Sequence, residues 1–205
     1  AFELTQKAAQ QDHVKAIYNV GWMYLTGDGV AKSNTNAVKF FQKAADKGNG
    51  TALAQLAWMY SGGDGVKKDR AKAIELYRKA ANKGNAYALA NLGWAYSTGD
   101  GVPKDQVKAI ELYLKAAEKG NAYAIGQLGW RYSTGDGVPK DKAKGIKLLQ
   151  EAVDKGDINA LGNLGWAYLY GDGVFMDKAK GINLLHQAAD KGDANALGNL
   201  GYAYS

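Results

Sequence analysis

The sequence of 205 residues contains no cysteine, only two prolines and no long run of apolar residues. The lack of cysteine excludes a disulfide framework and thiol chemistry, although it does not identify the compartment. No apolar stretch approaches the roughly 20 residues that a helical membrane span requires, so we expect no membrane span. Because 27 glycines accompany only two prolines, the chain does not have the composition of a disordered proline- and glycine-rich segment.

Charged residues are plentiful but mixed in sign. The chain has 26 Lys and Arg against 20 Asp and Glu, which gives a net charge of +6. Acids stand among the lysines, as in Glu111, Lys115 and Glu118, and this favours a solvated face over a nucleic-acid footprint. One regular row of lysines could track phosphates, but acids flank it; its members are Lys72, Lys108, Lys144 and Lys180. We therefore expect no nucleic-acid partner.

A 36-residue repeat dominates the sequence. The tetrapeptide Gly-Asp-Gly-Val returns at constant spacing, beginning at Gly27, Gly63, Gly99, Gly135 and Gly171. A tryptophan series keeps the same step, with Tyr202 in the sixth place: Trp22, Trp58, Trp94, Trp130 and Trp166. Because no insertion interrupts the period, neighbouring units must stack with nearly one geometry.

One repeat carries the start and stop signals of two helices. Asn85 is a good N-cap for a first helix over residues 86–97, here called an A helix. Gly99 can supply the positive φ of a tight helix stop, and Asp105 is the expected N-cap of a second helix, the B helix. Gly120 follows the B helix as its C′ residue. Each repeat is thus expected to form a helical hairpin.

The predicted fold class is all-α: a right-handed α/α superhelical solenoid of helical hairpins, with about twelve helices. We expect one repeat domain over residues 1–205. It would comprise a B-helix half repeat (1–12), full repeats (13–48, 49–84, 85–120, 121–156 and 157–192) and an A-helix half repeat (193–205).

The two ends of the sequence lead to further expectations. The start at Ala1 has no signal-peptide layout, which indicates a mature or trimmed product and leaves the compartment open. The last A helix would present an uncapped apolar face that includes Leu197, Leu200, Tyr202 and Tyr204. Such a face predicts either a continuing chain or end-to-end self-association.

The motifs of the repeat resemble the Sel-one-like repeat, a relative of the tetratricopeptide repeat with a longer hairpin loop. The matching residues in one repeat are Asn91-Leu92-Gly93, Tyr96, Gly99, Gly101-Val102, Lys104-Asp105, Lys108-Ala109 and Lys115-Ala116-Ala117. The resemblance covers essentially the whole chain. It implies an adaptor that assembles complexes in signalling, protein quality control or bacterial envelope and host-interaction processes. It carries no catalytic residues and no cofactor.

Departures from the family pattern are few. Ala57 stands in place of the repeat glycine, and Val20 in place of leucine. Phe175 and Met176 replace the Pro-Lys that precedes the B-helix cap in other repeats. We expect this last change to place an exposed apolar spot on the fifth loop.

A helical wheel divides the A helix into two sides. Leu89, Leu92 and Tyr96 fall together on the side that would face the core, with Gly93 allowing a close approach of the B helix. Trp94 falls almost opposite them, on the side that lines the concave groove of a tetratricopeptide-like array. The tryptophans could pack between successive A helices or form an aromatic ladder along the groove, and both can hold for one ring. A small residue four positions earlier is expected to leave room for the ring; it is Ala54, Ala90, Gly126, Gly162 or Gly198.

Three A-helix positions vary between repeats, and packing is not expected to dictate them. The position after the tryptophan holds Met23, Met59, Ala95, Arg131 and Ala167. The first exposed position holds Lys15, Thr51, Tyr87, Tyr123, Asn159 and Asn195. The amide position holds Asn19, Gln55, Asn91, Gln127, Asn163 and Asn199. Such amides could hold an extended peptide backbone, or they could tie down a neighbouring loop or helix end.

The leading functional hypothesis is a non-enzymatic scaffold that binds a peptide or loop of a partner protein in the groove. Trp, Tyr and Arg are the usual anchors of binding sites. The predicted partner-binding residues are Tyr87, Asn91, Trp94, Tyr123, Gln127, Trp130, Arg131, Trp58, Trp166, Trp22 and Asn163. The alternative is binding of a glycan or peptidoglycan fragment, because stacked tryptophans beside amides also suit sugar faces and hydroxyls.

Catalytic and metal sites are not expected. No set of nucleophile, base and orienting group recurs along the chain. Each Gly-Asp-Gly loop offers only one or two carboxylates to a cation, so a solvated turn aspartate is expected there. His13 and His186 occupy different repeat positions, and no cysteine or carboxylate cluster completes a zinc site. We predict no catalytic residue, metal or cofactor.

Overall fold

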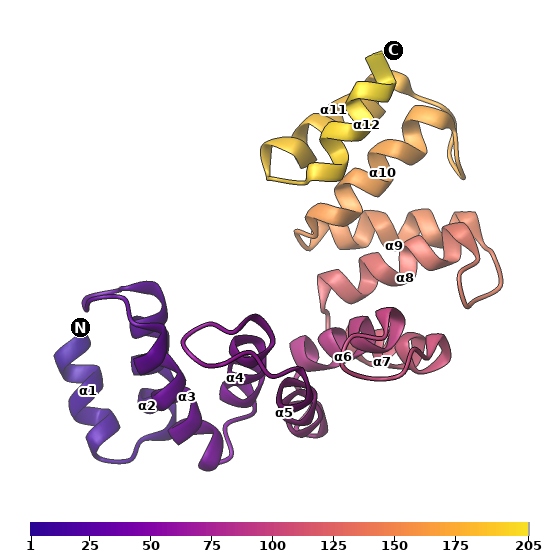
Figure 1. Ribbon diagram of the computed structural model, residues 1–205. Coiled ribbons are helices and arrows are strands. Elements are labelled where there is room, and N and C mark those ends of the chain that lie inside the picture. Colours follow the sequence, from indigo (N-terminus) through magenta and orange to yellow (C-terminus); the bar gives the residue numbers. More distant parts are fainter. Residues whose placement is uncertain (205) are drawn as a thin grey trace. The chain divides into compact units, whose positions relative to one another are not determined.

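A computed structural model describes residues 1–204 and contains twelve helices with no strand in that range (Figure 1). The A helices are α2 (Val14–Thr26), α4 (Gly50–Gly62), α6 (Ala86–Thr98), α8 (Ala122–Thr134), α10 (Ile158–Tyr170) and α12 (Ala194–Tyr204). The B helices are α1 (Phe2–Gln10), α3 (Asn34–Asp46), α5 (Arg70–Asn82), α7 (Gln106–Glu118), α9 (Lys142–Asp154) and α11 (Lys178–Asp190). This order confirms the predicted all-α array of helical hairpins.

The chain divides into two compact units. The N-terminal unit comprises Ala1–Asp105 and contains α1 to α6, and the C-terminal unit comprises Gln106–Ser205 and contains α7 to α12. Within each unit, an A helix packs against the B helix that follows it, as α4 does with α5 and α8 with α9. Two expectations stay predictions. One is that residues 1–205 act as a single repeat domain, and the other is that the array coils into a right-handed superhelix.

The predicted capping residues define the helix boundaries. Asn49 and Asn85 each accept a hydrogen bond at Oδ1 from the backbone N–H three residues later, at 2.9 Å. This contact satisfies one of the free N–H groups at a helix start. The expected side-chain caps of four B helices are also present: Ser33, Asp69, Asp141 and Asp177. Five A helices end at a glycine in the left-handed conformation, such as Gly99 with φ of 82°. The capping residues and glycines of each repeat therefore specify where its helices begin and end.

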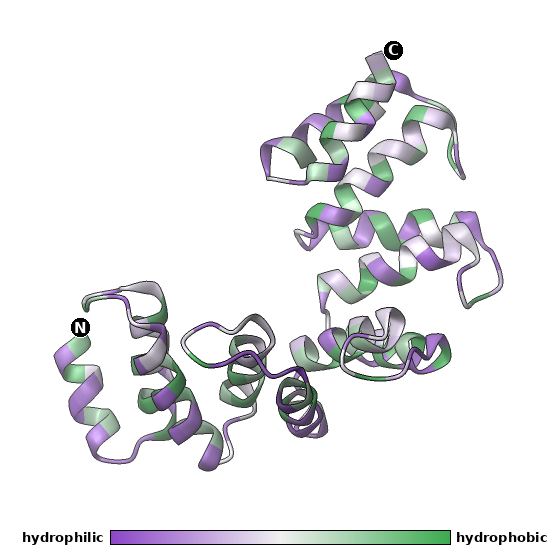
Figure 2. Cartoon of the chain, viewed as in Figure 1, coloured by the Kyte–Doolittle hydropathy of each residue, from purple (hydrophilic) through white to green (hydrophobic). Residues whose placement is uncertain are grey.

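The core is built from small and branched apolar side chains at helical spacing. In the N-terminal unit, Ala52, Leu56 and Ala73 are almost fully buried. In the C-terminal unit one cluster includes Ile125, Leu149, Ala152, Ala160 and Leu164, and a second includes Leu161, Leu169, Leu185, Ala188, Ala196 and Leu200. Apolar and polar stretches alternate along each helix, as expected when one side is buried (Figure 2).

Glycine permits the closest helix contacts of the C-terminal unit. A Cβ added to Gly129 on α8 would lie 2.9 Å from the backbone N of Leu149 and 3.0 Å from the carbonyl O of Gly145. A Cβ added to Gly165 on α10 would lie 3.1 Å from the carbonyl O of Gly181. The close approach predicted for the repeat glycine is thus present at both crossings.

Candidate functional site on the A helices

The tryptophan series is half covered and half exposed in every repeat. The exposed fractions are 42% for Trp22, 39% for Trp58, 38% for Trp94, 39% for Trp130 and 39% for Trp166. Trp94 lines a small cavity of about 30 Å³ together with Tyr77 of α5 and Asn91. Each ring therefore has a packed part and a solvent-accessible part. The partial exposure agrees with the expectation that one ring can be both packed and accessible, and an aromatic ladder along the groove stays a prediction.

Two amides of the predicted series, Asn91 and Gln127, bond within their own helices. Asn91 Nδ2 donates to the carbonyl O of Tyr87 at 2.8 Å. Gln127 Oε1 accepts from Arg131 Nη1 at 3.0 Å. These contacts leave part of each amide's hydrogen-bonding capacity free, because an amide offers two donors and an acceptor with two lone pairs. Neither contact ties a neighbouring loop or helix end, whereas Gln55 of α4 shares a hydrogen bond with the Tyr18 hydroxyl of α2.

Tyr87 and Tyr123 hold the first exposed position of α6 and α8, and each packs on a tyrosine of the preceding B helix. The rings of Tyr87 and Tyr77 meet edge to face with centroids 6.4 Å apart, and those of Tyr123 and Tyr113 with centroids 6.3 Å apart. Burial is the main cause that raises the pKa of Tyr77 and of Tyr123 above the usual value. Both phenols are therefore neutral at physiological pH and offer hydrogen bonds rather than charge.

Arg131 is a buried residue, and its expected role as an exposed anchor is wrong. Its exposed fraction is 3%, and its guanidinium carbon lies 5.0 Å from the ring centroid of Tyr113 and 5.5 Å from that of Trp130. The expectation that packing leaves the position after the tryptophan free is also wrong. All five residues there are buried: Met23, Met59, Ala95, Arg131 and Ala167. The position points into the space between an A helix and its neighbours.

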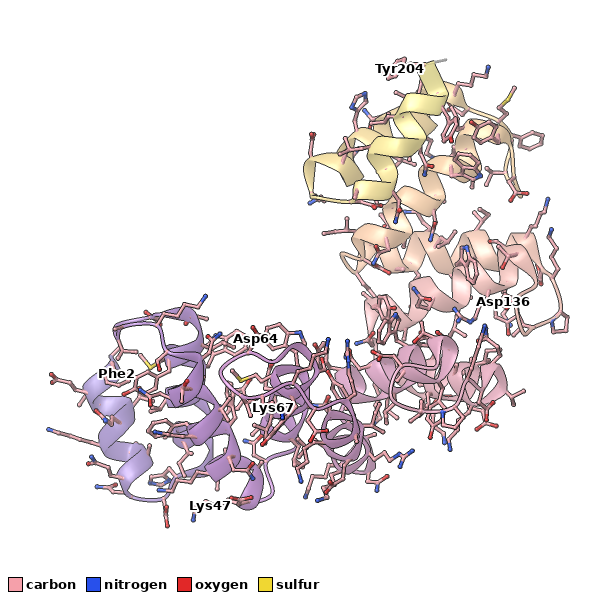
Figure 3. All side chains as sticks on the ribbon, viewed as in Figure 1. Phe2, Lys47, Asp64, Lys67, Asp136 and Tyr204 are labelled. Atoms are coloured by element: carbon pink, nitrogen blue, oxygen red, sulfur yellow. The ribbon has the colours of Figure 1, made fainter. Side chains whose placement is uncertain are left out.

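Arg131 also lies near a loop aspartate, as basic residues of two other repeats do. Asp100 pairs with Arg70 of α5 at 3.0 Å, and Asp172 pairs in the same way with Lys142 of α9. The corresponding first residue of α7 is the uncharged Gln106. In that repeat Arg131 supplies the cation instead, with Nε 3.9 Å from Asp136 Oδ2. Asp136 lies in the loop between α8 and α9 (Figure 3).

These ion pairs correct the expectation of a merely solvated turn aspartate for three of the five loops, those of Asp100, Asp136 and Asp172. Asp100 and Asp172 connect the Gly-Asp-Gly loop to the B helix of the preceding hairpin. The exposed apolar spot on the fifth loop is confirmed, since Phe175 is 97% and Met176 62% exposed.

Two A-helix glycines make room for carboxylates rather than for indole rings. A Cβ at Gly162 would lie 2.5 Å from Asp193 Oδ2, and a Cβ at Gly126 would clash with Asp157 Oδ2 in the same way. Asp157 and Asp193 cap α10 and α12, where each Oδ1 accepts from a backbone N–H two residues later. The expected reason for the small residue is therefore wrong at these two glycines.

A cavity of about 340 Å³ opens on the A helices of the C-terminal unit, and we call it the amide cavity. Its amide side chains are Gln127, Asn159, Asn163, Asn195 and Asn199. Trp130, Tyr123, Gly162 and Asp193 complete its lining. The cavity thus brings together four of the predicted binding residues from α8 and α10: Tyr123, Gln127, Trp130 and Asn163.

The other predicted residues lie outside this cavity. Trp166 lies on α10 in the same unit, and Arg131 is buried beside the cavity's Gln127. Tyr87, Asn91, Trp94, Trp58 and Trp22 belong to the N-terminal unit. The cavity also contains Asp193, which the sequence reasoning did not select. Its signal is the change from Asn at the caps of α4, α6 and α8 to Asp at the caps of α10 and α12.

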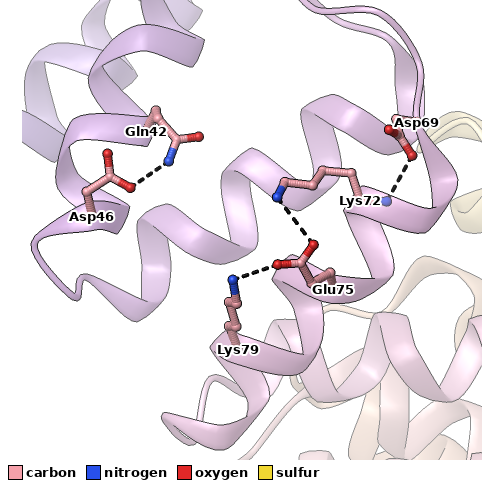
Figure 4. A network of polar contacts seen from close by, with 6 residues as sticks. All are labelled: Gln42, Asp46, Asp69, Lys72, Glu75 and Lys79. Atoms are coloured by element: carbon pink, nitrogen blue, oxygen red, sulfur yellow. Dashed lines mark hydrogen bonds and ion pairs between the residues drawn. The ribbon is translucent and has the colours of Figure 1, made fainter.

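Charge is almost absent from the A helices and concentrated on the B helices. Within α2 to α12, the A helices carry only Lys15 and Arg131 as charged residues. On the B helices, Glu75 joins Lys72 and Lys79 in a network (Figure 4). The row of lysines is partly engaged, because Lys144 and Lys180 each place Nζ 3.9 Å from a tyrosine ring centroid. The cavity is therefore neutral apart from the carboxylate of Asp193.

Within residues 1–204, no three His, Cys, Asp or Glu side chains are grouped so that they could hold a metal ion. In that part of the chain, no helix combines the length and the apolarity that crossing a bilayer would require.

Comparisons with known proteins agree with the repeat and the helical hairpins. The Sel1 repeat matches six consecutive segments, at residues 1–13, 14–49, 50–85, 86–121, 122–157 and 158–193. The chain belongs to the Sel1 repeat family. The family match confirms the resemblance seen in the sequence. Members of the family are generally non-enzymatic scaffolds for protein–protein interactions. Among curated proteins, no sequence matches this chain.

Several solved structures are similar to this Sel1 repeat chain. A Sel1 repeat protein from Oxalobacter formigenes is 37% identical, with a TM-score of 0.82 over 94% of this chain and 78% of that one. A protective antigen of uropathogenic Escherichia coli strains is also 37% identical, with a TM-score of 0.78 over 98% of this chain. The match spans 43% of the antigen's length. An immunity protein from Pseudomonas aeruginosa is 25% identical, with a TM-score of 0.62 over 91% of this chain and 73% of that one.

Proposed function

We propose that this Sel1 repeat protein is a non-enzymatic scaffold that binds an extended peptide or loop of a partner protein along its A helices. The observation that carries the proposal is the amide cavity, where five amide side chains surround the half-exposed Trp130. The volume of about 340 Å³ lies within the range of pockets that hold ligands.

The chemistry of the cavity suits a polypeptide backbone. An extended chain presents N–H and C=O groups at regular intervals, and Asn and Gln can satisfy both kinds. The indole of Trp130 and the ring of Tyr123 add apolar area for a side chain of the partner. Because the A helices hold so little charge, such a segment would be recognised by hydrogen bonds and shape. The similarity to a protein named as an immunity protein supports a protein partner.

A peptide selection tests the proposal. Random peptides displayed on phage would be selected on the immobilised chain, and recovered peptides would be measured against Trp130→Ala combined with Asn163→Ala. We expect this double variant to weaken binding at least about tenfold, since it removes an aromatic anchor and an amide. The matched control is Leu114→Ala, an exposed apolar residue of α7 outside the cavity. Peptides that bind both variants as tightly as the wild type would contradict the proposal.

A glycan or peptidoglycan fragment is the second candidate. The observation that favours it is the same half-exposed tryptophan beside amides, because an indole face can stack on a sugar and amides can bond its hydroxyls. Titration with chito-oligosaccharides and with muropeptides separates the two candidates, with tryptophan fluorescence as the readout. A saturable change that is lost in the Trp130 and Asn163 double variant would favour the glycan.

A further inference from the structure

The amide cavity contains one acidic group that forms no ion pair with any residue in the described range 1–204. Asp193 is 9% exposed and lines the cavity, and its Oδ1 accepts from the backbone N–H of Asn195 at 2.9 Å. Within residues 1–204 no Lys, Arg or His nitrogen lies within ion-pairing distance of Asp193. A mostly buried carboxylate is costly unless hydrogen bonds and an opposite charge compensate it.

Helix capping does not require this charge. The A helices α4, α6 and α8 are capped by the neutral Asn49, Asn85 and Asn121, which accept the same kind of hydrogen bond. Asn and Asp are about equally good caps. The negative charge at Asp193 is therefore additional to what the fold uses.

The change from Asn to Asp comes with a second change on the preceding A helix. Before the Asn caps at Asn85 and Asn121, the residue four positions ahead of the tryptophan is alanine, Ala54 or Ala90. Before Asp193 it is Gly162, and the second carboxylate oxygen occupies the place where a Cβ would lie. The absence of a side chain at Gly162 thus leaves the space that the Asp193 carboxylate occupies.

The remaining lining suits the flat, delocalised cation of arginine. Trp130 and Tyr123 offer aromatic rings, which attract a guanidinium more strongly than they attract neutral groups. The oxygens of the surrounding amides can accept its several N–H groups. The chain already holds one guanidinium in such surroundings, since Arg131 lies over Tyr113 and donates to Gln127 Oε1.

From this arrangement we infer that the amide cavity binds an arginine side chain of the partner segment, with Asp193 as its counter-charge. The inference rests on the proposed function, because it names the chemistry of the segment that the A helices would hold. Asp157 is not part of the cavity lining, although it is the equivalent cap of α10. It therefore provides a matched control for a charge of the same kind in the same unit.

The direct test uses a small probe, N-acetyl-arginine methylamide, and its uncharged analogue N-acetyl-citrulline methylamide. Binding would be followed by the chemical shift of the Trp130 indole N–H. We expect the arginine probe to bind at least about tenfold more tightly than the citrulline probe, as a charge-assisted hydrogen bond implies. Asp193→Asn keeps a capping side chain and should abolish this difference, whereas Asp157→Asn should change the affinity by less than about threefold.

Three results would overturn the inference: equal affinity for the two probes, an unchanged preference in Asp193→Asn, or no shift of the Trp130 signal. Thermal unfolding of both Asp→Asn variants checks that each folds. The peptide selection separates this inference from the proposed function. Recovered peptides that depend on Trp130 and Asn163 but contain no arginine would contradict the arginine site and support the scaffold. An absence of cavity-dependent peptides would contradict the scaffold itself.

Discussion

The two units follow one 36-residue period but use it differently. In the N-terminal unit, Ala57 of α4 and Ala73 of α5 are fully or almost fully buried at the positions where the C-terminal unit has Gly129 and Gly145. The caps of α4 and α6 are Asn, whereas those of α10 and α12 are Asp. The first exposed positions of α10 and α12 carry Asn159 and Asn195, where α6 carries Tyr87.

From this difference we infer that the invariant positions of the repeat specify the helical hairpin, whereas linked changes at a few variable positions specify the surface of the A helices. Asparagine in place of tyrosine leaves space on the A helices, and aspartate in place of asparagine adds charge to that space. The cavity lined by amides and Trp130 lies in the C-terminal unit. Substitutions in both units test whether tight helix crossings and buried charge are confined to the C-terminal unit.

The largest effect is expected for Gly129→Val at the crossing of α8 and α9. The new side chain would overlap the backbone of Leu149 and Gly145, which cannot move aside as a flexible side chain can. We expect the free energy of unfolding in urea to fall by about 3 kcal/mol. Gly201→Ala is the matched control, because Gly201 holds the same repeat position on α12 but a Cβ there meets nothing within 4 Å. A Gly129→Val protein as stable as the wild type would show that the crossing is not tightly packed.

The next effect is expected for Arg131→Ala. The change removes the cation beside Asp136, the donor to Gln127 and the side chain packed on Tyr113. We expect a loss of about 2 kcal/mol in the free energy of unfolding. Adding Gln106→Arg should restore part of it, since Arg70 at the same position of α5 reaches Asp100. Failure of this second change to rescue would contradict the idea that the two positions share one task.

A smaller, pH-dependent effect is expected for Asp157→Asn. Burial is the main cause that raises the pKa of Asp157, so the folded state holds its proton more strongly than the unfolded state does. Stability from this group is therefore present at low pH and declines as pH rises from the unfolded pKa of about 3.9 through the raised folded pKa. We expect the variant to be more stable than the wild type near neutral pH, by at most about 1 kcal/mol, with the gap closing in acid. Melting temperatures across this range measure it, and a gap that widened in acid would have the wrong sign.

The smallest effect is expected for Arg70→Ala in the N-terminal unit. The side chains of Arg70 and Asp100 are 38% and 27% exposed, so solvent and salt weaken their attraction. We expect a loss of at most about 1 kcal/mol, and less in high salt. Urea unfolding at two salt concentrations measures it. A loss as large as that of Arg131→Ala would mean that burial does not separate the two arginines.

Much of the fold could be predicted because capping residues and glycines in each repeat indicate where its helices begin and end. Asn85 and Gly99 define helix ends by local hydrogen bonds and backbone conformation, which depend on neighbours in the sequence. The half-exposed state of Trp94 was also within reach of a helical wheel. Arg131 was not, because its burial depends on Tyr113 and Gln127 and on the missing charge at Gln106. A wheel describes one helix and contains no information about the partner that covers it.

The candidate site was predictable only in part for the same reason. Tyr123, Gln127, Trp130 and Asn163 were selected by residue type and side of the helix, and they share one cavity. Asp193 could not be selected in this way. Its place in the cavity depends on its contact with Gly162 of the preceding A helix, and a wheel of one helix does not show such a contact. Comparing the caps of all repeats would have marked both Asp157 and Asp193 as different, but would not have shown that Asp193 alone of the two lines a cavity.

The uniform exposure of the five indoles has a spectroscopic consequence. With exposed fractions between 38% and 42%, the tryptophans have similar solvent access, so the emission of the whole chain averages over the hairpins. Tyr202 occupies the same repeat position, which makes Trp→Tyr the natural replacement at the other five. Chains that keep a single indole would each report on one hairpin, and a set of five would follow the order in which neighbouring hairpins melt.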